Sequence, residues 1–457
     1  MGFKKGFLWG GSVSSMQTEG AYDLDGRGVS IYDVRDIDPK YSDWKDGIDY
    51  YHRYKQDHDL YQQMSINAIR TSIAWSRVIP DGEGKVNELG LKFYDDIVDD
   101  MLSKGIEPIF CLYHFDMPYA LMEKYGGWQN RKVLDAYVRY ARIIIEHFKG
   151  RVKYYIPFNE QNICPMINLV DETNHCEKNQ KNRNQIQHHF FMASAWVAII
   201  CHETDPNIKC CGMVNYMTIY PKTCKPEDVF ASYKADRVLN QQTLEVLATG
   251  KYPSDLLQVY KDTGMPKMED GDLQILEKGK SDVMTFSYYK SFVMDDSLYE
   301  KNDLQEELTM KASNNLLDNP YVEKTEWGTF IDPQGLRVAA NQIWNNYHLP
   351  VFITECGIGV RETSDENGYV DDEYRINYLH DHILALKQAV DEDGVDLIGF
   401  LTWGPIDILS SAGDMDKRYG FIYVNRDNHD LKDLKRSKKR SFDWYKQVIE
   451  SNGEIIK

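Results

Sequence analysis

Two glutamates stand in apolar surroundings far apart in the chain, Glu160 in "IPFNE" and Glu355 in "FITEC". A pair of facing carboxylates can cleave a glycosidic bond. One protonates the leaving oxygen, while the other attacks the anomeric carbon or activates a water molecule. A glutamate that closes a strand is more often a solvated loop residue, so the chemistry depends on the elements that position the pair.

Eight apolar runs, each followed by polar residues, are spaced along the chain. Unbroken runs of this kind are typical of strands buried on both faces, as in a parallel sheet. Residues 131–149 and 373–390, which lie between runs, carry apolar side chains at the spacing of one helix face. The alternation predicts an α/β fold, a single (β/α)8 TIM barrel over residues 1–457, with strands in 7–13, 67–78, 107–114, 154–160, 209–217, 282–289, 350–357 and 397–407.

A doubly wound open sheet is the main alternative fold. That fold carries a glycine-rich phosphate-binding turn after its first strand. Neither "GGS" at 10–12 nor "GIG" at 357–359 fits the fingerprint of this turn. The length of 457 residues is also compatible with about three ordinary domains, but we find no linker or break in composition that would separate them.

In a (β/α)8 barrel the carboxyl ends of all strands meet at one mouth. The two glutamates, which close the fourth and seventh runs, would then face the same space. Other run ends bring amide, imidazole and aromatic groups to this mouth: Gln17, Trp75, Arg77, His114, Asn159, Tyr288, Tyr289, Trp403 and Asp407. Amide and imidazole groups suit sugar hydroxyls, and indole faces suit the C–H surface of a sugar, so we expect a sugar site. For Trp75, packing in the barrel is the favoured interpretation.

The chain is acidic, with 53 basic and 71 acidic side chains and a net charge of −18. This charge argues against a nucleic acid or an anionic membrane as partner. Eight cysteines without metal-ligand spacing predict free thiols in a reducing compartment and no metal site. The first apolar run is too short for a signal peptide and no run reaches membrane-spanning length, so we expect a cytoplasmic protein.

Seven segments, taken together, resemble the successive signatures of glycoside hydrolase family 1. They are "FLWGGSVSSMQTEGA", "RTSIAWSRVIP", "YHFDMP", "PFNE", "SYY", "FITECGIG" and "KRYGFIYVNRD", and they run from residue 7 to about residue 427 in the family's order. The resemblance implies a (β/α)8 barrel that cleaves β-glycosides with retention of configuration. It implies no metal or organic cofactor.

The resemblance also assigns roles to single residues. Glu160 matches the general acid/base, and Glu355 matches the nucleophile. Arg70 and Tyr289 match groups that contact and orient the nucleophile, and a structural ion pair of Arg70 is compatible with that role. Positions that match sugar-binding residues are Gln17, His114, Asn159 and Trp403.

Electrostatics makes the two glutamate roles consistent. The charge of Glu355 is expected to keep Glu160 protonated until the sugar esterifies Glu355, and Arg70 is expected to keep Glu355 ionised. Retention further predicts that the two carboxyl groups lie about 5–5.5 Å apart.

The segment "WGPIDILSSAGDMDKRYG" (403–420) departs from the plain β-glucosidases of the family. Those enzymes carry a segment resembling "WSLMDNFEW", whose glutamate binds the 4- and 6-hydroxyls of the sugar. A carboxylate would repel a phosphate on O6, so its absence leaves room for one. The segment resembles that of the 6-phospho-β-glucosidases, and Ser411, Lys417 and Tyr419 match their phosphate-binding residues. Arg418 is expected to be structural, and the alternative for Lys417 is a solvated loop with an Asp416–Lys417 pair.

Two further positions bear on the substrate. "SYY" has Ser287 where plain β-glucosidases usually carry asparagine, which argues against an ordinary glucoside. The 6-phospho-β-galactosidases tend to carry a tryptophan just before the phosphate-binding serine, where this chain has Ser410. The small side chain would admit an equatorial O4, so a gluco configuration is favoured.

The sequence therefore predicts a retaining 6-phospho-β-glucosidase that acts on a phosphorylated disaccharide, such as cellobiose 6-phosphate, or on a phosphorylated aryl glucoside. An ordinary β-glucosidase, a 6-phospho-β-galactosidase and a non-catalytic sugar-binding barrel remain alternatives, and a homo-oligomer is left open. The aglycone would lie against loops at 162–185 and 295–326, which carry no readable motif. The basic run at 432–445 is interpreted as the exposed start of a terminal helix.

Overall fold

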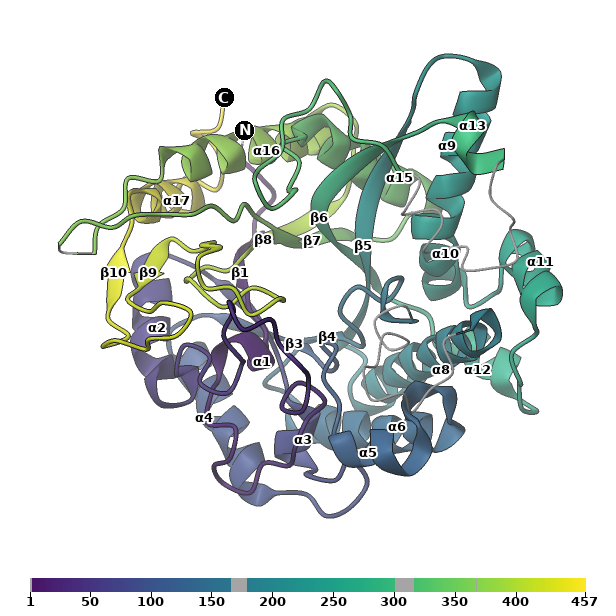
Figure 1. Cartoon of the computed structure of the whole chain (residues 1–457), viewed down its shortest axis with the longest axis horizontal. Helices are drawn as coiled ribbons and strands as arrows, with labels where there is room; N and C mark the ends of the chain where they lie inside the picture. The colour runs from purple at the N-terminus through teal and green to yellow at the C-terminus, as the bar shows by residue number, and fades with distance from the viewer. Residues whose placement is uncertain (1, 166–178, 301–315, 367) are drawn as a thin grey trace.

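Eight parallel strands close into a barrel in the computed structural model, which describes residues 2–165, 179–300, 316–366 and 368–457 (Figure 1). The strands follow chain order, and the eighth pairs with the first, so the predicted TIM barrel is confirmed and the open sheet is wrong. They are β1 (Leu8–Ser12), β2 (Ala68–Ser72), β3 (Glu107–Cys111), β4 (Tyr154–Ile156), β5 (Lys209–Pro221), β6 (Val283–Met294), β7 (Val351–Cys356) and β8 (Leu397–Trp403).

Helices surround the barrel (Figure 1). The helical spacing seen at 131–149 and 373–390 is confirmed by α6 (Arg131–His147) and α16 (Glu373–Asp391). The other helices are α1 (Ser15–Thr18), α2 (Tyr50–Gln63), α3 (Trp75–Val78), α4 (Glu88–Ser103), α5 (Tyr119–Tyr125), α8 (Gln180–Thr204), α9 (Pro226–Asp236), α10 (Gln242–Thr249), α11 (Ser254–Thr263), α12 (Asp272–Lys278), α13 (Asp296–Glu300), α15 (Pro333–Tyr347) and α17 (Arg440–Glu450). The described residues also form a 3₁₀ turn at Gly127–Gln129, a π turn at Arg237–Gln241 and a small sheet of β9 (Ile422–Val424) with β10 (Arg436–Lys438).

A layer of apolar side chains fills the barrel below its mouth. Its members include Ala68, Ile109, Ile156, Met213 and Phe352, all buried in one cluster. Because side chains alternate along a strand, the residue two positions further toward the mouth points into the same space. Arg70 therefore stands above Ala68, and the apolar floor supports the polar groups of the site.

The second run ends earlier than predicted. β2 stops at Ser72, and Trp75–Val78 form the short helix α3. Trp75 is fully buried and stacks on Tyr140 with 5.2 Å between ring centroids. Trp75 and Arg77 therefore do not end a strand at the mouth, whereas the packing role favoured for Trp75 is confirmed.

The basic run at 432–445 is an exposed helix start only in its last part, where α17 begins, and buried ion pairs hold its earlier part. Arg436 lies in β10 and forms a buried ion pair with Asp57, with 2.8 Å between Nε and Oδ1. The buried Lys439 places its Nζ 2.7 Å from Oδ1 of Asp407 and also pairs with Glu362. These cations tie the C-terminal segment to the barrel, a role that their sequence spacing does not reveal.

The cysteines among the described residues are free thiols, as expected, and all of them but Cys224 are buried. Among the helices of the described ranges, none combines the length and the apolar character needed to cross a membrane. The aglycone loops are described only in part, because residues 166–178 and 301–315 lie outside the described ranges, and α8 already begins at Gln180.

Candidate active site

Glu355 lies in β7 with both carboxylate oxygens occupied. Nη1 of Arg70 in β2 donates to its Oε1, and the hydroxyl of Tyr289 in β6 donates to its Oε2 at 2.9 Å. The second arm of Arg70 donates from Nη2 to Oδ1 of Asn159 at 2.6 Å. The structure thus brings four of the expected site residues, from three strands and the segment after β4, into one connected network.

Glu160 follows β4 in an unusual backbone conformation. Its φ is +46°, in the left-handed region that residues other than glycine seldom occupy. Hydrogen bonds on both sides hold it there, from the Asn159 N–H to the Tyr113 carbonyl at 2.8 Å and from the Gln161 N–H to the Met213 carbonyl at 2.9 Å. Neighbouring strands therefore impose a local strain that aims the carboxyl group of Glu160.

Two donors converge on one oxygen of Glu160. Nδ2 of Asn215 donates to Oε1 at 2.8 Å, and the hydroxyl of Ser287 donates to the same atom. Neither residue was among the expected site residues. The sequence could have indicated Ser287, because it is the first residue of the "SYY" motif, whereas Asn215 lies in the fifth run with no motif around it.

The two glutamates differ in their electrostatic surroundings. Burial raises the pKa of Glu160 to about 7, and the charge of Glu355 adds to this, while the bonds from Ser287 and Asn215 lower it. Burial also raises the pKa of Glu355, whereas its ion pair with Arg70 and the bond from Tyr289 act to lower it. As expected, the charge of Glu355 raises the pKa of Glu160 and the charge of Arg70 lowers that of Glu355, but burial has the larger effect on both pKa values.

Most residues expected to bind the sugar lie in this network or contact one another. The Oδ1 of Asn159 faces Arg70, so its amide nitrogen is left to donate elsewhere. The ring of His114 stacks on that of Trp403, with 5.8 Å between centroids and 21° between planes. Burial holds the pKa of His114 well below its ordinary value, and the charge of Arg70 adds to this, so the imidazole is neutral. Gln17, in α1, donates to the Leu409 carbonyl at 2.7 Å and accepts from the Ser14 hydroxyl at 2.6 Å.

Lys417 and Tyr419 lie together beside the strand that carries Glu355. Nζ of Lys417 stands 5.4 Å from the centroid of the Tyr419 ring. Gly359, which follows β7, leaves the space they use, since a Cβ there would lie 2.6 Å from Cγ of Lys417 and 3.0 Å from Cε1 of Tyr419. Ser411 is exposed on the preceding turn, and no contact joins it to either residue within the described parts of the chain.

Lys417 is half-buried and lacks a carboxylate partner among the residues that the structure describes. The alternative Asp416–Lys417 pair is wrong, because Asp416 pairs with Arg361 instead. Burial lowers the pKa of Lys417 to about 8, and repulsion from Lys290 adds to this, while Asp414 opposes it. Partial burial of a cation that has no carboxylate partner is costly, so this position is suited to an incoming anion.

Arg418 is structural, as expected. Its guanidinium is buried, donates to the Val424 carbonyl at 2.8 Å and lies 3.4 Å from Oδ2 of Asp407. The other oxygen of Asp407 binds Lys439, so one carboxylate links the segment 403–420 to the start of α17. This arrangement corrects the expectation that Asp407 stands at the mouth among the sugar-site groups.

Tyr288 is also placed differently from the expectation. It is fully buried, and its hydroxyl donates to the Asp332 carbonyl at 3.1 Å, on the side of β6 that faces α15. Tyr289, the next residue, bonds to Glu355 on the opposite side. The alternation of a strand separates the two tyrosines, so only one of them contributes to the site.

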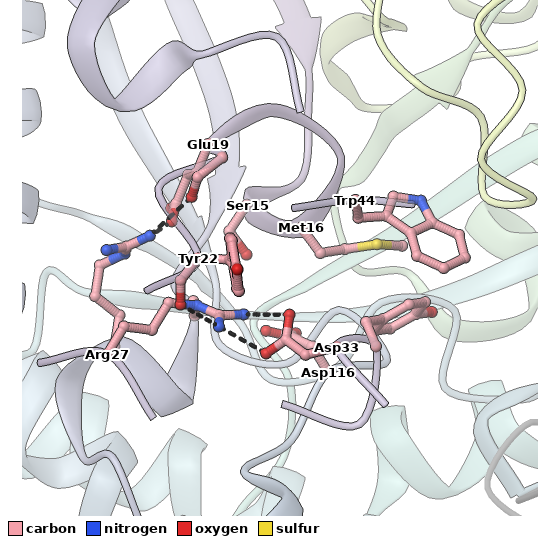
Figure 2. Close-up of a pocket in the computed structure, with 12 residues that line it drawn as sticks. Ser15, Met16, Glu19, Tyr22, Arg27, Asp33, Trp44 and Asp116 are labelled. Carbon is pink, nitrogen blue, oxygen red and sulfur yellow. Dashed lines mark hydrogen bonds and ion pairs between the residues drawn. The ribbon is translucent and has the colours of Figure 1, made fainter. Parts of the chain in front are cut away.

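A polar pocket is lined by Ser15 and Met16 of α1 and by side chains from the segments that follow β1, β2 and β3 (Figure 2). Two ion pairs border it, Arg77 with Glu19 at 3.0 Å and Arg27 with Asp33 at 2.7 Å. Asp116 also lines it, and burial raises the pKa of this carboxyl to about 7. Asp116 accepts from the His114 N–H at 3.2 Å, which connects the pocket wall to the sugar-site groups.

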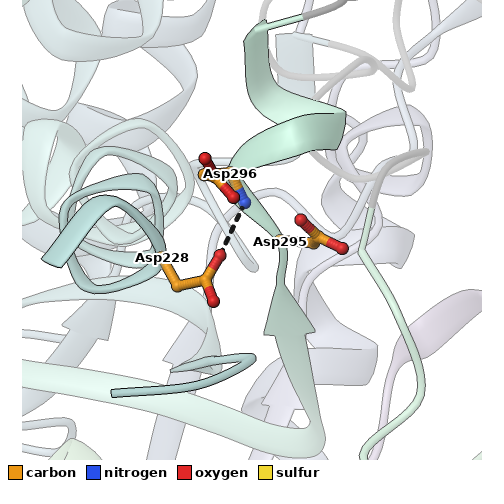
Figure 3. Close-up of side chains that lie close together, drawn as sticks. All are labelled: Asp228, Asp295 and Asp296. Atoms are coloured by element: carbon orange, nitrogen blue, oxygen red, sulfur yellow. Dashed lines mark hydrogen bonds between the residues drawn. The ribbon is translucent and has the colours of Figure 1, made fainter. Parts of the chain in front are cut away.

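One group of three carboxylates, among the described residues, is close enough together to hold a cation. It consists of Asp228, Asp295 and Asp296, at the far ends of β5 and β6 (Figure 3). Lys222 pairs with Asp295 and Lys225 with Asp296, the latter at 3.0 Å. Its carboxylates are therefore largely neutralised by the chain itself.

Comparisons with known proteins identify the family of the chain. The model of glycosyl hydrolase family 1 matches residues 1–454. The chain is 41% identical to the aryl-phospho-beta-D-glucosidase BglH of Bacillus subtilis, covering 99% of this chain and 98% of the relative. It is 40% identical to a phospho-cellobiase of Klebsiella oxytoca, covering 100% and 99%.

A solved structure shows the same architecture. The family 1 β-glucosidase of Thermotoga maritima superposes with a TM-score of 0.87 at 29% identity, covering 99% of this chain and 98% of that one. The family match, the two relatives and this superposition all extend over nearly the full chain. The chain therefore belongs to glycosyl hydrolase family 1.

Proposed function

We propose that this chain is a retaining 6-phospho-β-glucosidase, which hydrolyses β-glucosides that carry a phosphate on O6. The observation that carries the proposal is Lys417, half-buried beside Tyr419 and without a carboxylate partner in the described ranges. The names of the two relatives, an aryl-phospho-β-glucosidase and a phospho-cellobiase, support the same substrate class. Phosphorylated disaccharides and phosphorylated aryl glucosides are the expected substrates.

In the first step of the proposed reaction, Glu355 attacks the anomeric carbon as a carboxylate. The bond from that carbon to the leaving oxygen breaks, and protonated Glu160 gives its proton to this oxygen. Arg70 and Tyr289 hold the two oxygens of Glu355, so the attacking atom is positioned before the substrate arrives. Asn159, Gln17 and His114 hold sugar hydroxyls, and Trp403 lies under the sugar ring.

In the second step, water attacks the ester formed with Glu355. Esterification has removed the charge of Glu355, which was one cause of the raised pKa of Glu160. Glu160 can then ionise, take a proton from the attacking water and release Glu355 as a carboxylate. Each catalytic group returns to its starting protonation state, so no further reactant is needed.

The phosphate group is proposed to bind Ser411, Lys417 and Tyr419 through a hydroxyl, a cation and a phenol. Ser410, the residue before Ser411, supports a gluco rather than a galacto sugar, because its small side chain leaves room beside O4. Its hydroxyl accepts from the Asp414 N–H at 3.0 Å and is therefore committed to the turn. A 6-phospho-β-galactosidase and an ordinary β-glucosidase remain the alternatives to be tested.

We further propose that residues 1–457 form one catalytic domain that works in the cytoplasm. The pairing of β1 with β8 supports a single domain, since the barrel needs both ends of the chain. A phosphorylated sugar does not cross a membrane unaided, so the enzyme is expected where the sugar is phosphorylated. The free thiols fit a reducing compartment.

The deciding experiment compares p-nitrophenyl β-glucoside with its 6-phosphate, in the wild type and in Lys417→Ala. We expect the wild type to prefer the phosphorylated substrate, and Lys417→Ala to raise KM for that substrate alone. Lys435→Ala, at an exposed position outside the site, serves as a control for loss of charge. A preference for the unphosphorylated glucoside would refute the proposed specificity, and no turnover of either would favour a binding protein.

A further inference from the structure

The two donors to Glu160 come from adjacent strands at one level of the barrel. Asn215 in β5 and Ser287 in β6 are register partners, and Ser287 is in turn the register partner of Glu355 in β7. Both donors contact Oε1 of Glu160, at 2.8 Å in the case of Asn215. No hydrogen bond from any described residue reaches the second oxygen, Oε2.

Hydrogen bonds hold the backbone of Asn215, the donor in β5, in place. The amide of Asn162 accepts from the Asn215 N–H at 2.8 Å and donates to the Asn215 carbonyl at 2.8 Å. Asn162 itself follows Glu160 by two residues and also donates to the Leu239 carbonyl at 2.7 Å. The segment that carries the carboxyl group therefore also fixes the strand position from which its donor approaches.

The two donors make the two oxygens of Glu160, Oε1 and Oε2, different in their ability to carry a proton. An oxygen that accepts two hydrogen bonds has no lone pair well placed for a proton, whereas the other oxygen does. We propose that Asn215 and Ser287 are positioning residues that keep Oε1 of Glu160 unprotonated, so that Oε2 alone exchanges the catalytic proton. This inference deepens the proposed function, on which it rests.

The proton then follows one path in both steps. Oε2–H of Glu160 gives its proton to the leaving oxygen as the glycosidic bond breaks and the ester to Glu355 forms. In the second step the same Oε2 takes a proton from water while the new C–O bond forms and Glu355 departs. Without the two donors, the carboxyl group could rotate or carry its proton on Oε1, where it is directed away from the leaving group.

The test uses leaving groups that differ in their need for a proton. Cellobiose 6-phosphate has a poor leaving group and requires acid assistance, whereas 2,4-dinitrophenyl 6-phospho-β-glucoside does not. In Ser287→Ala and Asn215→Ala we expect kcat/KM to fall by about 10-fold to 100-fold on the first substrate and by less than about threefold on the second. Ser287→Thr, which keeps the hydroxyl, should restore most of the activity.

Ser291→Ala is the matched control. Ser291 lies on the same strand, is fully buried, and its hydroxyl has no hydrogen-bond partner in the described structure. The same truncation there should leave both substrates unaffected. A similar loss on both substrates in Ser287→Ala, or no loss on either, would overturn the inference.

Asn215→Asp tests the opposite arrangement, in which Oε1 carries the proton and donates it to the amide oxygen. An aspartate could still accept such a bond, so activity would be kept, which would contradict the inference. If instead Oε1 is an acceptor, the aspartate supplies no donor and repels ionised Glu160, and activity should fall. If the wild type prefers unphosphorylated glucosides, the same two leaving groups can be compared on unphosphorylated substrates. The proposed phosphate specificity and the proposed role of the two donors can therefore fail independently of each other.

Discussion

Arg70 and Glu355 form an ion pair that is almost completely buried, with 0% and 4% of their side chains exposed. A buried pair of this kind contributes little net stability, but loss of one partner leaves the other charge in an apolar environment. Arg70→Met should therefore lower kcat/KM by about 100-fold or more, equivalent to about 3 kcal/mol.

The pH profile separates this effect from a general loss of structure. Since Arg70 acts to lower the pKa of Glu355, Arg70→Met should move the acid limb of kcat/KM to higher pH. Arg70→Lys keeps the charge and should shift the limb less. An unchanged acid limb in Arg70→Met would mean that the arginine acts only on the fold.

The lowered pKa of Lys417 predicts that binding of the phosphorylated substrate, but not of an unphosphorylated one, weakens at alkaline pH. Because burial lowers its pKa to about 8, the side chain loses its charge above that pH in the free protein. KM for the phosphorylated substrate should rise by about tenfold from about pH 7 to about pH 9, while KM for an unphosphorylated glucoside stays level. Parallel changes in the two KM values would contradict a role of Lys417 in phosphate binding.

Ionisation of Glu160 should lower the free energy of unfolding at alkaline pH. Its pKa is raised to about 7 in the folded protein from 4.5, so folding favours the protonated form. That stabilisation is fully present below about pH 4.5 and is lost as the pH rises through about 7. Glu160→Gln, which cannot ionise, should therefore unfold with a free energy about 3 kcal/mol higher than wild type at about pH 8 and about equal to it at about pH 4. Urea unfolding at the two pH values measures the difference.

Asp407 should matter to phosphate binding although it lies outside the site. It holds Arg418 and Lys439 with its two oxygens, both in a buried setting. Asp407→Asn should lower the free energy of unfolding by about 3–5 kcal/mol and raise KM mainly for the phosphorylated substrate. Arg361→Ala removes an exposed pair from the same loop and should cost about 0–1 kcal/mol. Equal effects of the two changes would show that Asp407 does not anchor the loop.

Much of the barrel could be predicted because its strands are buried on both faces and read as apolar runs. Run length was less informative, since residues beyond a strand end remain apolar when they enter another buried element. Trp75 is such a case, because it belongs to a helix packed under Tyr140. β5 and β6 extend further than expected, to Pro221 and Met294, where polar residues such as Thr218, Lys290 and Ser291 interrupt the apolar run.

The candidate site was predictable where a motif named the residue. Glu160, Glu355, Arg70 and Tyr289 all lie in the quoted signatures. In the structure Arg70 and Tyr289 bond directly to Glu355, and Arg70 extends this network to Asn159, whereas Glu160 is not bonded to it. Asn215 could not be found, because its contribution depends on the register between β5 and β6, which no local pattern encodes. The roles of Asp407 and Lys439 were likewise missed, since a buried ion pair joins residues 32 positions apart.

The left-handed backbone at Glu160 has an evolutionary consequence. Any side chain other than glycine costs about 1–2 kcal/mol in this conformation. A laboratory selection for thermal resistance alone does not protect the glutamate, since Glu160→Gly relieves the backbone while it removes the acceptor of Asn215 and Ser287 and abolishes acid catalysis. Only selection that includes turnover would keep a glutamate there, so heat-resistant variants of this enzyme need to be screened for both properties at once.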